Sequence, residues 1–557
     1  MRNPDLRLRK LSKVLNSTKK VQELNIEFQD CPEMSNTQLS YIGQSLKRLS
    51  CMKDLRFILK ECSLINDEGL YALCAGLKKF PSLESLSLGF TQGEIADRGI
   101  QRLSSCLKRL RNLRNLELNF YECETSDVGL KSLSNGFKNL KRLENLSIDF
   151  SLCGKQLTDA GVQSLSEGFK RLNLSLKSLS LNFPFNKKIS EVGLKSLQES
   201  LEKLVLLQKL DLRFQVCLKV TNIGFQDVMK GLESLTLLKE ITLYFSRTGI
   251  TDLALNDFGH TLKDLKYLEI LRISFSKCGL TDAGLCFLSE VGKKLKTFEA
   301  KFYSCAGVTD LGLQKLGLGL GKFVSLRTLS LSFRECDEIT DTGLESFSEG
   351  LGKLSLLQNL RTDFGRCSKI TDRGLIFFCE GALKKLVLLE ILELNFSGCS
   401  GITHQGGFKL CGIVKDLSSS LKIIHWNFSE CDLLSDIELS IFCKSLESCH
   451  LLEKIIVKYG QDKSIIVHGQ QRIAYWLCYI TKSLAEKRKK KNVKVEEKGQ
   501  ELKKEEEGEK TLEEKEKKEE REKTLEKNKK KNRSRLNGLK KLFGCFTEKK
   551  GEKTKRF

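Results

Sequence analysis

Cysteine and histidine are the residues of this chain best suited to chemistry, because they bind metals, form disulfides and act as nucleophiles. The sequence contains 21 Cys and five His. Zinc sites usually pair one Cys-x₂₋₄-Cys knuckle with a second, and no such pair of knuckles occurs here. We therefore expect no metal site.

The spacing of the cysteines indicates a structural role instead. Eleven of them lie three residues after a recurring Phe or its equivalent, and Asn186 takes this place once. They are Cys31, Cys62, Cys123, Cys153, Cys217, Cys278, Cys305, Cys336, Cys367, Cys399 and Cys431. A small side chain with a weak S–H donor suits a buried turn whose carbonyl groups need partners.

No other group of residues forms a recognisable catalytic site. The segment 317–322 resembles a phosphate-binding loop, but Phe323 stands where such a loop needs Ser or Thr. No Ser–His–Asp or Cys–His arrangement stands out, and no carboxylate pair can be argued to converge. We expect a non-enzymatic protein without a cofactor.

The recurring Phe belongs to a repeat of about 31 residues, Leu-x-Leu-x-Phe-x-x-Cys followed by Ile/Leu-Thr-Asp-x-Gly-Leu. Its strand-ending positions are Phe28, Leu59, Phe90, Phe120, Phe150, Phe183, Phe214, Phe245, Phe275, Phe302, Phe333, Phe364, Phe396, Phe428 and Tyr459. The unit from Phe275 to Phe302 is shorter, with 27 residues. A fixed period of this size indicates stacked repeats, which work through extended surfaces.

Each unit predicts one strand and one helix. Leu-x-Leu-x-Phe alternates apolar and polar residues, as in a half-buried strand. The apolar residues downstream are three or four positions apart, which is helical spacing. The Thr or Ser before the Asp is placed to cap that helix, as at Thr251 and Thr340.

These residues resemble the leucine-rich repeat signature, Leu-x-x-Leu-x-Leu-x-x-[Asn/Cys]-x-Leu. The helix length is similar to the ribonuclease-inhibitor type, and the Cys before Ile-Thr-Asp-x-Gly-Leu is similar to the cysteine-containing type of F-box leucine-rich proteins. The period exceeds the usual range of about 20–29 residues, and many family members lack the Phe. The resemblance implies an intracellular α/β solenoid of about fifteen coils.

Simple geometry agrees with a horseshoe. Strands stack about 4.8 Å apart, whereas helices are about 10 Å wide, so the coil must bend with a parallel sheet on its inner arc. Polar residues of the middle strands should face this arc, where Arg and Tyr are typical of binding hot spots. The candidate partner-binding residues are Arg213, Tyr244, Arg272, Lys301, Tyr303, Arg334, Arg361 and Asp363.

The charge of the chain is concentrated in its tail. The whole sequence has 94 basic and 71 acidic residues, net +23, of which residues 481–557 carry 29 and 17. The Lys/Glu-rich part has too few apolar residues for a core, so we expect a disordered or solvated helical segment.

The end of the tail combines a basic cluster with apolar residues at helical spacing, which could anchor it at an anionic membrane or in a partner groove. The candidate anchor residues are Arg533, Arg535, Leu539, Lys540, Lys541, Leu542, Phe543, Cys545 and Phe546. Acylation of Cys545 would supply a second anchoring signal. The favoured interpretation is nevertheless a purely solubilising tail. Anchoring is the first alternative, and nuclear localisation or contact with nucleic acid is the less favoured one.

We divide the chain into an N-terminal cap (1–20), a solenoid (21–462), a C-terminal cap helix (463–485) and the tail (486–557). The apolar residues expected to pack in the two caps are Leu6, Leu8, Leu11 and Leu15, and Ile473, Trp476, Leu477 and Ile480. Residues 1–20 lack the apolar core of a signal peptide, and free thiols favour a reducing compartment. We expect a cytoplasmic, monomeric scaffold that binds a protein on its concave surface. A substrate receptor of a ubiquitin ligase is the alternative, although no F-box is seen before the first strand.

Overall fold

The computed structural model describes residues 14–15, 20–49, 51–153, 156–289, 294–431, 435–461, 463–471, 473–474, 477, 515, 517–531 and 533. The chain divides into two compact units, Met1–Cys478 and Tyr479–Phe557. The first unit contains the whole solenoid, and the second contains the charged tail.

Sixteen strands form one sheet in which each strand pairs with its neighbours in sequence. From β1 to β15 the pairing is parallel and in register, so that Leu329 lies beside Leu360 of the next repeat. The strands are β1 Glu23–Gln29, β2 Asp54–Lys60, β3 Ser85–Thr91, β4 Asn115–Asn119, β5 Asn145–Asp149, β6 Ser178–Asn182, β7 Lys209–Arg213, β8 Glu240–Tyr244, β9 Ile270–Ser274, β10 Thr297–Lys301, β11 Thr328–Ser332, β12 Asn359–Asp363, β13 Ile391–Asn395, β14 Ile423–Ser429, β15 Lys454–Gly460 and β16 Lys463–His468.

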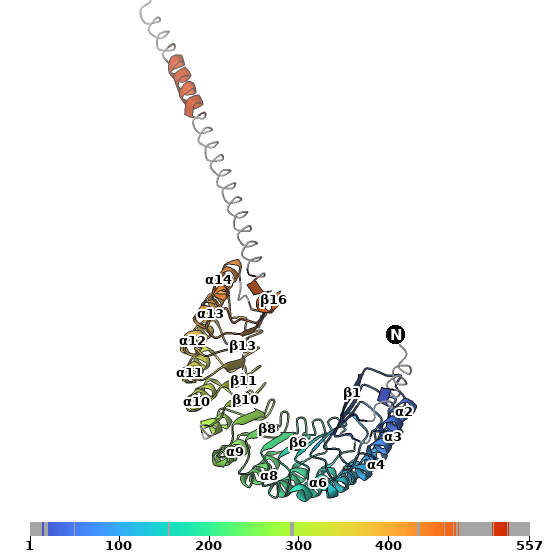
Figure 1. Cartoon of the computed structure of the whole chain (residues 1–557). Helices are drawn as coiled ribbons and strands as arrows, with labels where there is room; N and C mark the ends of the chain where they lie inside the picture. The colour runs from blue at the N-terminus through green and yellow to red at the C-terminus, as the bar shows by residue number, and fades with distance from the viewer. Residues whose placement is uncertain are drawn as a thin grey trace, which may run out of the picture. The chain divides into compact units, whose positions relative to one another are not determined.

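The helices cover the outer side of the arc and the strands line its inner side (Figure 1). The α-helices are α2 Asn36–Leu46, α3 Asp67–Leu77, α4 Asp97–Leu107, α5 Asp127–Gly136, α6 Asp159–Phe169, α7 Glu191–Leu201, α8 Asn222–Glu233, α9 Asp252–Asp264, α10 Asp310–Leu320, α11 Asp341–Leu351, α12 Asp372–Gly381, α13 His404–Asp416 and α14 Asp436–Glu447. Four 3₁₀ turns accompany them, η1 Phe137–Asn139, η2 Lys170–Leu172, η3 Gly284–Ser289 and η4 Leu383–Lys385. This is the arrangement of a leucine-rich repeat solenoid, as the sequence predicts.

The strand-ending Phe residues stack on one another along the core. The ring centroids of Phe120 and Phe150 lie 5.4 Å apart, and those of Phe302 and Phe333 are also 5.4 Å apart. Stacked aromatic pairs stabilise a core beyond their burial alone. This stacking explains why the repeat carries Phe where its strand ends.

The turns that follow β1 to β14 share a positive φ at the second residue after the strand-ending Phe or its equivalent. At Glu335 this φ is 58°, and the Glu335 N–H donates to the turn of the next repeat, here Gly365 O at 2.9 Å. The repeated Cys follows: the Cys336 thiol donates to Phe302 O of the preceding repeat at 3.2 Å. The prediction that buried cysteines provide partners for turn carbonyls is confirmed.

The Thr-Asp-x-Gly segment links consecutive helices. Asp310, at the start of α10, accepts hydrogen bonds from the Thr340 backbone N–H at 2.7 Å and from its hydroxyl at 2.6 Å. Thr340 caps α11 by accepting from Thr342 N–H at 3.2 Å. A side chain at Gly343 would collide with the Asp310 carboxylate. The motif is therefore an inter-repeat joint as well as a helix cap.

Thr251 departs from the predicted capping. It forms no side-chain cap hydrogen bond, and its hydroxyl instead accepts from the Asn222 amide at 2.9 Å. Asn222 replaces the usual Asp at the start of α8 and offers an N–H where a carboxylate would only accept. The backbone part of the joint is kept, because Thr251 N–H donates to Asn222 Oδ1 at 2.8 Å.

The prediction of a cap helix over 463–485 is wrong at its start. Lys463–His468 forms β16, which pairs antiparallel with β15. Its β-branched residues alternate with polar ones, which suits a strand, and Ile465 and Val467 are each 8% exposed. Helical residues begin at Gln470, and Ile473 and Leu477 are buried as expected of a cap; Trp476 and Ile480 lie outside the described residues.

The short unit contains the 3₁₀ segment η3 where its neighbours have an α-helix. On the inner side of this unit, β9 and β10 remain paired in register. At the N-terminus, Leu15 is buried, with 3% exposure, in line with a cap. The other apolar residues expected there, Leu6, Leu8 and Leu11, lie outside the described residues.

Candidate functional site

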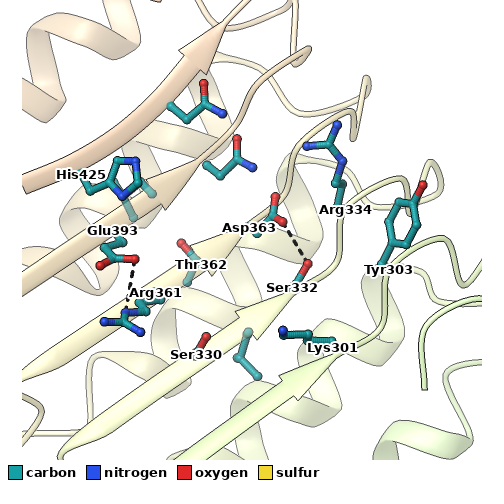
Figure 2. A pocket seen from close by; sticks show the side chains of 14 residues that line it. Lys301, Tyr303, Ser330, Ser332, Arg334, Arg361, Thr362, Asp363, Glu393 and His425 are labelled. Carbon is teal, nitrogen blue, oxygen red and sulfur yellow. Dashed lines mark hydrogen bonds and ion pairs between the residues drawn. The ribbon is translucent and has the colours of Figure 1, made fainter. Parts of the chain in front are cut away.

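The concave face is built from two positions of each strand, the residues between the buried Leu, Leu and Phe side chains. An open depression with a volume of about 540 Å³ lies on this face across β10 to β14. Figure 2 shows side chains from these strands converging on it. Its polar and aromatic lining is Lys301, Tyr303, Ser330, Ser332, Arg334, Arg361, Thr362, Asp363, Glu393, Asn395, His425 and Asn427.

Two cross-strand pairs fix the charges on the floor of this concave depression (Figure 2). Arg361 Nε lies 3.2 Å from Glu393 Oε2 on the adjacent strand. Ser332 Oγ donates to Asp363 Oδ2 at 3.0 Å. The other Asp363 oxygen accepts from the Gly365 N–H at 3.0 Å. Both carboxylates are therefore already hydrogen-bonded or ion-paired within the chain.

Three further side chains occupy the edge where the strands end. Lys301 is exposed on β10, and Tyr303 and Arg334 stand on the turns beyond β10 and β11 (Figure 2). Arg334 Nε is 3.9 Å from Glu335 Oε1, a long ion pair at the surface. Such exposed pairs contribute little to stability, so these cations remain available to a carboxylate of another molecule.

Arg213 and Tyr244 form a second group on the neighbouring strands β7 and β8. Arg213 donates to both oxygens of Asp211, at 2.9 and 3.0 Å, and this hydrogen bonding raises the pKa of Arg213. Its guanidinium carbon lies 5.0 Å from the Tyr244 ring centroid. Lys301 Nζ is 5.8 Å from the same ring, which connects this group to the concave depression.

Arg272 is the predicted site residue whose charge is most fully engaged within the chain. It lies between two carboxylates, with Nη1 2.5 Å from Glu240 Oε1 and Nε 3.1 Å from Glu299 Oε1. Burial by itself would lower the pKa of Arg272, but the hydrogen bonds and charges of these glutamates raise it above its usual value. Arg272 therefore ties β8, β9 and β10 together.

The structure thus unites Lys301, Tyr303, Arg334, Arg361 and Asp363 in one depression. The sequence prediction missed the residues that complete its far side, Glu393, Asn395, His425 and Asn427. The sequence could have indicated them, because they stand between the apolar residues of β13 and β14 just as Arg361 and Asp363 do in β12. None of these four residues is an Arg or a Tyr, and the prediction relied mainly on those two residue types.

The predicted anchor lies almost entirely outside the described residues; of its members only Arg533 is described, as an exposed helical residue. Among the residues that the structure describes, no cluster of three or more His, Cys, Asp or Glu side chains could hold a metal ion. None of the described helices has the length and apolarity needed to cross a bilayer.

No protein-family model matches the chain, and no curated protein matches it. Among solved structures it is similar to the yeast Rad7–Elc1 complex, with 19% identity and a TM-score of 0.39 over 72% of this chain and 86% of that chain. It is also similar to an LRR protein of Leptospira interrogans, with 16% identity and a TM-score of 0.38 over 80% and 98%.

Proposed function

We propose that the chain is a non-enzymatic scaffold that binds a partner protein on its concave surface. The observation that supports this function is the concave depression, in which five successive strands and their turns present polar, aromatic and cationic side chains. The backbone beneath them is fixed by sheet pairing, so the chain would lose little backbone conformational freedom on binding. Tyr and Arg are also the residue types that contribute most at interfaces.

The carboxylates that are already paired within the chain indicate which other residues are left to contact the partner. Glu393 and Asp363 are held by groups of this chain, whereas Lys301 is exposed and Tyr303 is half-buried. Lys301, Tyr303 and Arg334 should therefore contact carboxylates and apolar groups of the partner. Arg361 and Asp363 should act mainly by keeping the floor of the depression in shape.

Affinity purification with the full chain tests this function. We expect Lys301→Glu combined with Tyr303→Ala to lose partners that the wild-type chain retains. Lys131→Glu, an exposed charge reversal on α5, is the matched control and should retain them. Equal recovery with both variants would contradict concave binding. Recovery of a ubiquitin-ligase adaptor by the wild-type chain would instead favour the ligase alternative.

A further inference from the structure

The positive-φ turn residues form a second surface along the edge of the solenoid. They occur one per repeat, most of them exposed and Val216 half-buried, and from residue 122 to residue 277 their chemistry changes from acidic to apolar to basic. The consecutive members are Glu122, Leu152, Phe185, Val216, Arg247 and Lys277. Leu218 adds another exposed apolar side chain, 57% accessible, beside Val216. We call Leu152, Phe185, Val216 and Leu218 the rim patch.

Neither burial nor backbone preference accounts for the apolar residues of the rim patch. Phe185 and Val216 have φ values of 66° and 63°, a region that bulky and β-branched residues rarely adopt and that Asn, Asp and Gly tolerate best. Phe185 is nevertheless 42% exposed and Leu152 37% exposed. A residue type that is unfavourable for the turn and unfavourable in water points to a binding role.

The rim patch is held rigidly. Leu152 N–H donates to Pro184 O at 3.0 Å, Phe185 N–H to Gln215 O at 2.8 Å, and Val216 N–H to Ser246 O at 2.9 Å. Successive turns are therefore spaced much like the strands, about 4.8 Å apart. An α-helix rises about 5.4 Å per turn, so a helix lying along the row would place one side chain beside each repeat.

The two turn residues that follow the rim patch are basic. Arg247 and Lys277 are exposed, and Lys277 Nζ lies 4.9 Å from the centroid of the Tyr303 ring. Lys187 and Lys219 are also exposed, two and three residues after Phe185 and Val216. A complementary ligand must therefore carry acidic side chains next to its apolar ones.

We propose that this row docks an amphipathic helix of a partner protein. Three successive turns of that helix present apolar side chains to Leu152, Phe185 and Val216, and the next two present carboxylates to Arg247 and Lys277. The proposal rests on the proposed function only in that the chain binds protein. It concerns the turns at the edge of the sheet, a row that meets the concave depression where Lys277 lies against Tyr303.

A labelled synthetic helix of about 18 residues, five turns, is the probe, with Leu on three turns of one face and Glu on the next two. Fluorescence anisotropy with the full chain should show saturable binding. Phe185→Asn together with Val216→Asn should weaken it roughly tenfold or more. Asn suits the positive φ, so these variants should fold normally. Gln92→Asn, at the same turn position of an earlier repeat, should bind as the wild type does.

Two further measurements separate this proposal from the concave one. A peptide with Lys in place of its Glu residues should bind much more weakly, whereas Arg361→Ala should leave peptide binding unchanged. No saturable binding, or equal binding by wild type and the double Asn variant, would overturn the proposal. Either of those results would leave partner capture through Lys301 and Tyr303 unaffected, and that capture is measured independently.

Discussion

The thiol of Cys336 shows how one residue type joins neighbouring repeats. It is fully buried and donates to the Phe302 carbonyl of the preceding repeat at 3.2 Å. Cys336→Ala removes this donor and leaves a buried carbonyl without it, which should lower the free energy of unfolding by about 1–3 kcal/mol. Urea unfolding monitored by circular dichroism measures the loss. Cys51→Ala, at an exposed cysteine, is the control; the same loss in both would contradict this role.

The same burial makes stability depend on pH. Burial raises the pKa values of Cys336 and Cys367 from the usual 9.0 to about 12. The folded state thus holds these protons more tightly than the unfolded state does. Their contribution is fully present below about pH 9 and is lost as the pH rises toward about 12. The urea midpoint should stay level up to about pH 8 and then fall; a midpoint that rises above pH 9 would be inconsistent with buried neutral thiols.

At the scale of elements, the helices are held in line by the joint between the first Asp of one helix and the cap of the next. Asp310→Ala removes the acceptor for both Thr340 groups and should cost about 1–3 kcal/mol of unfolding free energy. Asp310→Asn should cost less, because Asn222 makes the equivalent backbone contact to Thr251 at 2.8 Å. Chemical denaturation of both variants compares them. Equal losses would show that the carboxylate acts only through its charge.

The strands and helices were predicted well from the sequence because the apolar residues of each repeat alternate in the strand and lie three or four positions apart in the helix. The ion pairs between side chains of adjacent strands were harder to predict. Arg272 has the residue type and position of a binding residue, yet Glu240 and Glu299 engage its charge from both sides. Which carboxylates reach a given Arg depends on the register of neighbouring strands and on side-chain conformation. The spacing within one repeat does not contain that information.

The errors at the element scale have similar causes. The helical spacing of Ile473, Trp476 and Leu477 predicted a cap helix, but the alternating segment before it was assigned to the same helix rather than to β16. The rim patch was overlooked because its residues stand outside the alternating strand pattern. The signal for Leu152, Phe185 and Val216, each two positions after a strand-ending Phe, becomes meaningful only once the positive φ of that turn is known.

At the scale of the whole molecule, the tail is a unit of its own. Its described residues 517–531 are helical and exposed, with Lys523 Nζ 3.6 Å from Glu519 Oε2. Such exposed pairs add little stability. Removing residues 486–557 should therefore leave the thermal unfolding midpoint and concave partner capture unchanged, as measured by calorimetry and affinity purification. A lowered midpoint would mean that the tail packs on the solenoid. The anchoring role of Phe543 and Phe546 stays a prediction.

The proposed function requires that the inner side of the solenoid contacts the partner. Site-specific photo-crosslinking tests it most directly, with benzoylphenylalanine placed at Tyr303 beside the concave depression or at Phe408 on α13. Phe408 is 57% exposed on an outer helix, and Tyr303 is half-buried at the edge of the depression. We predict a crosslinked partner from position 303 and none from position 408. Crosslinking from position 408 alone would contradict binding on the concave surface.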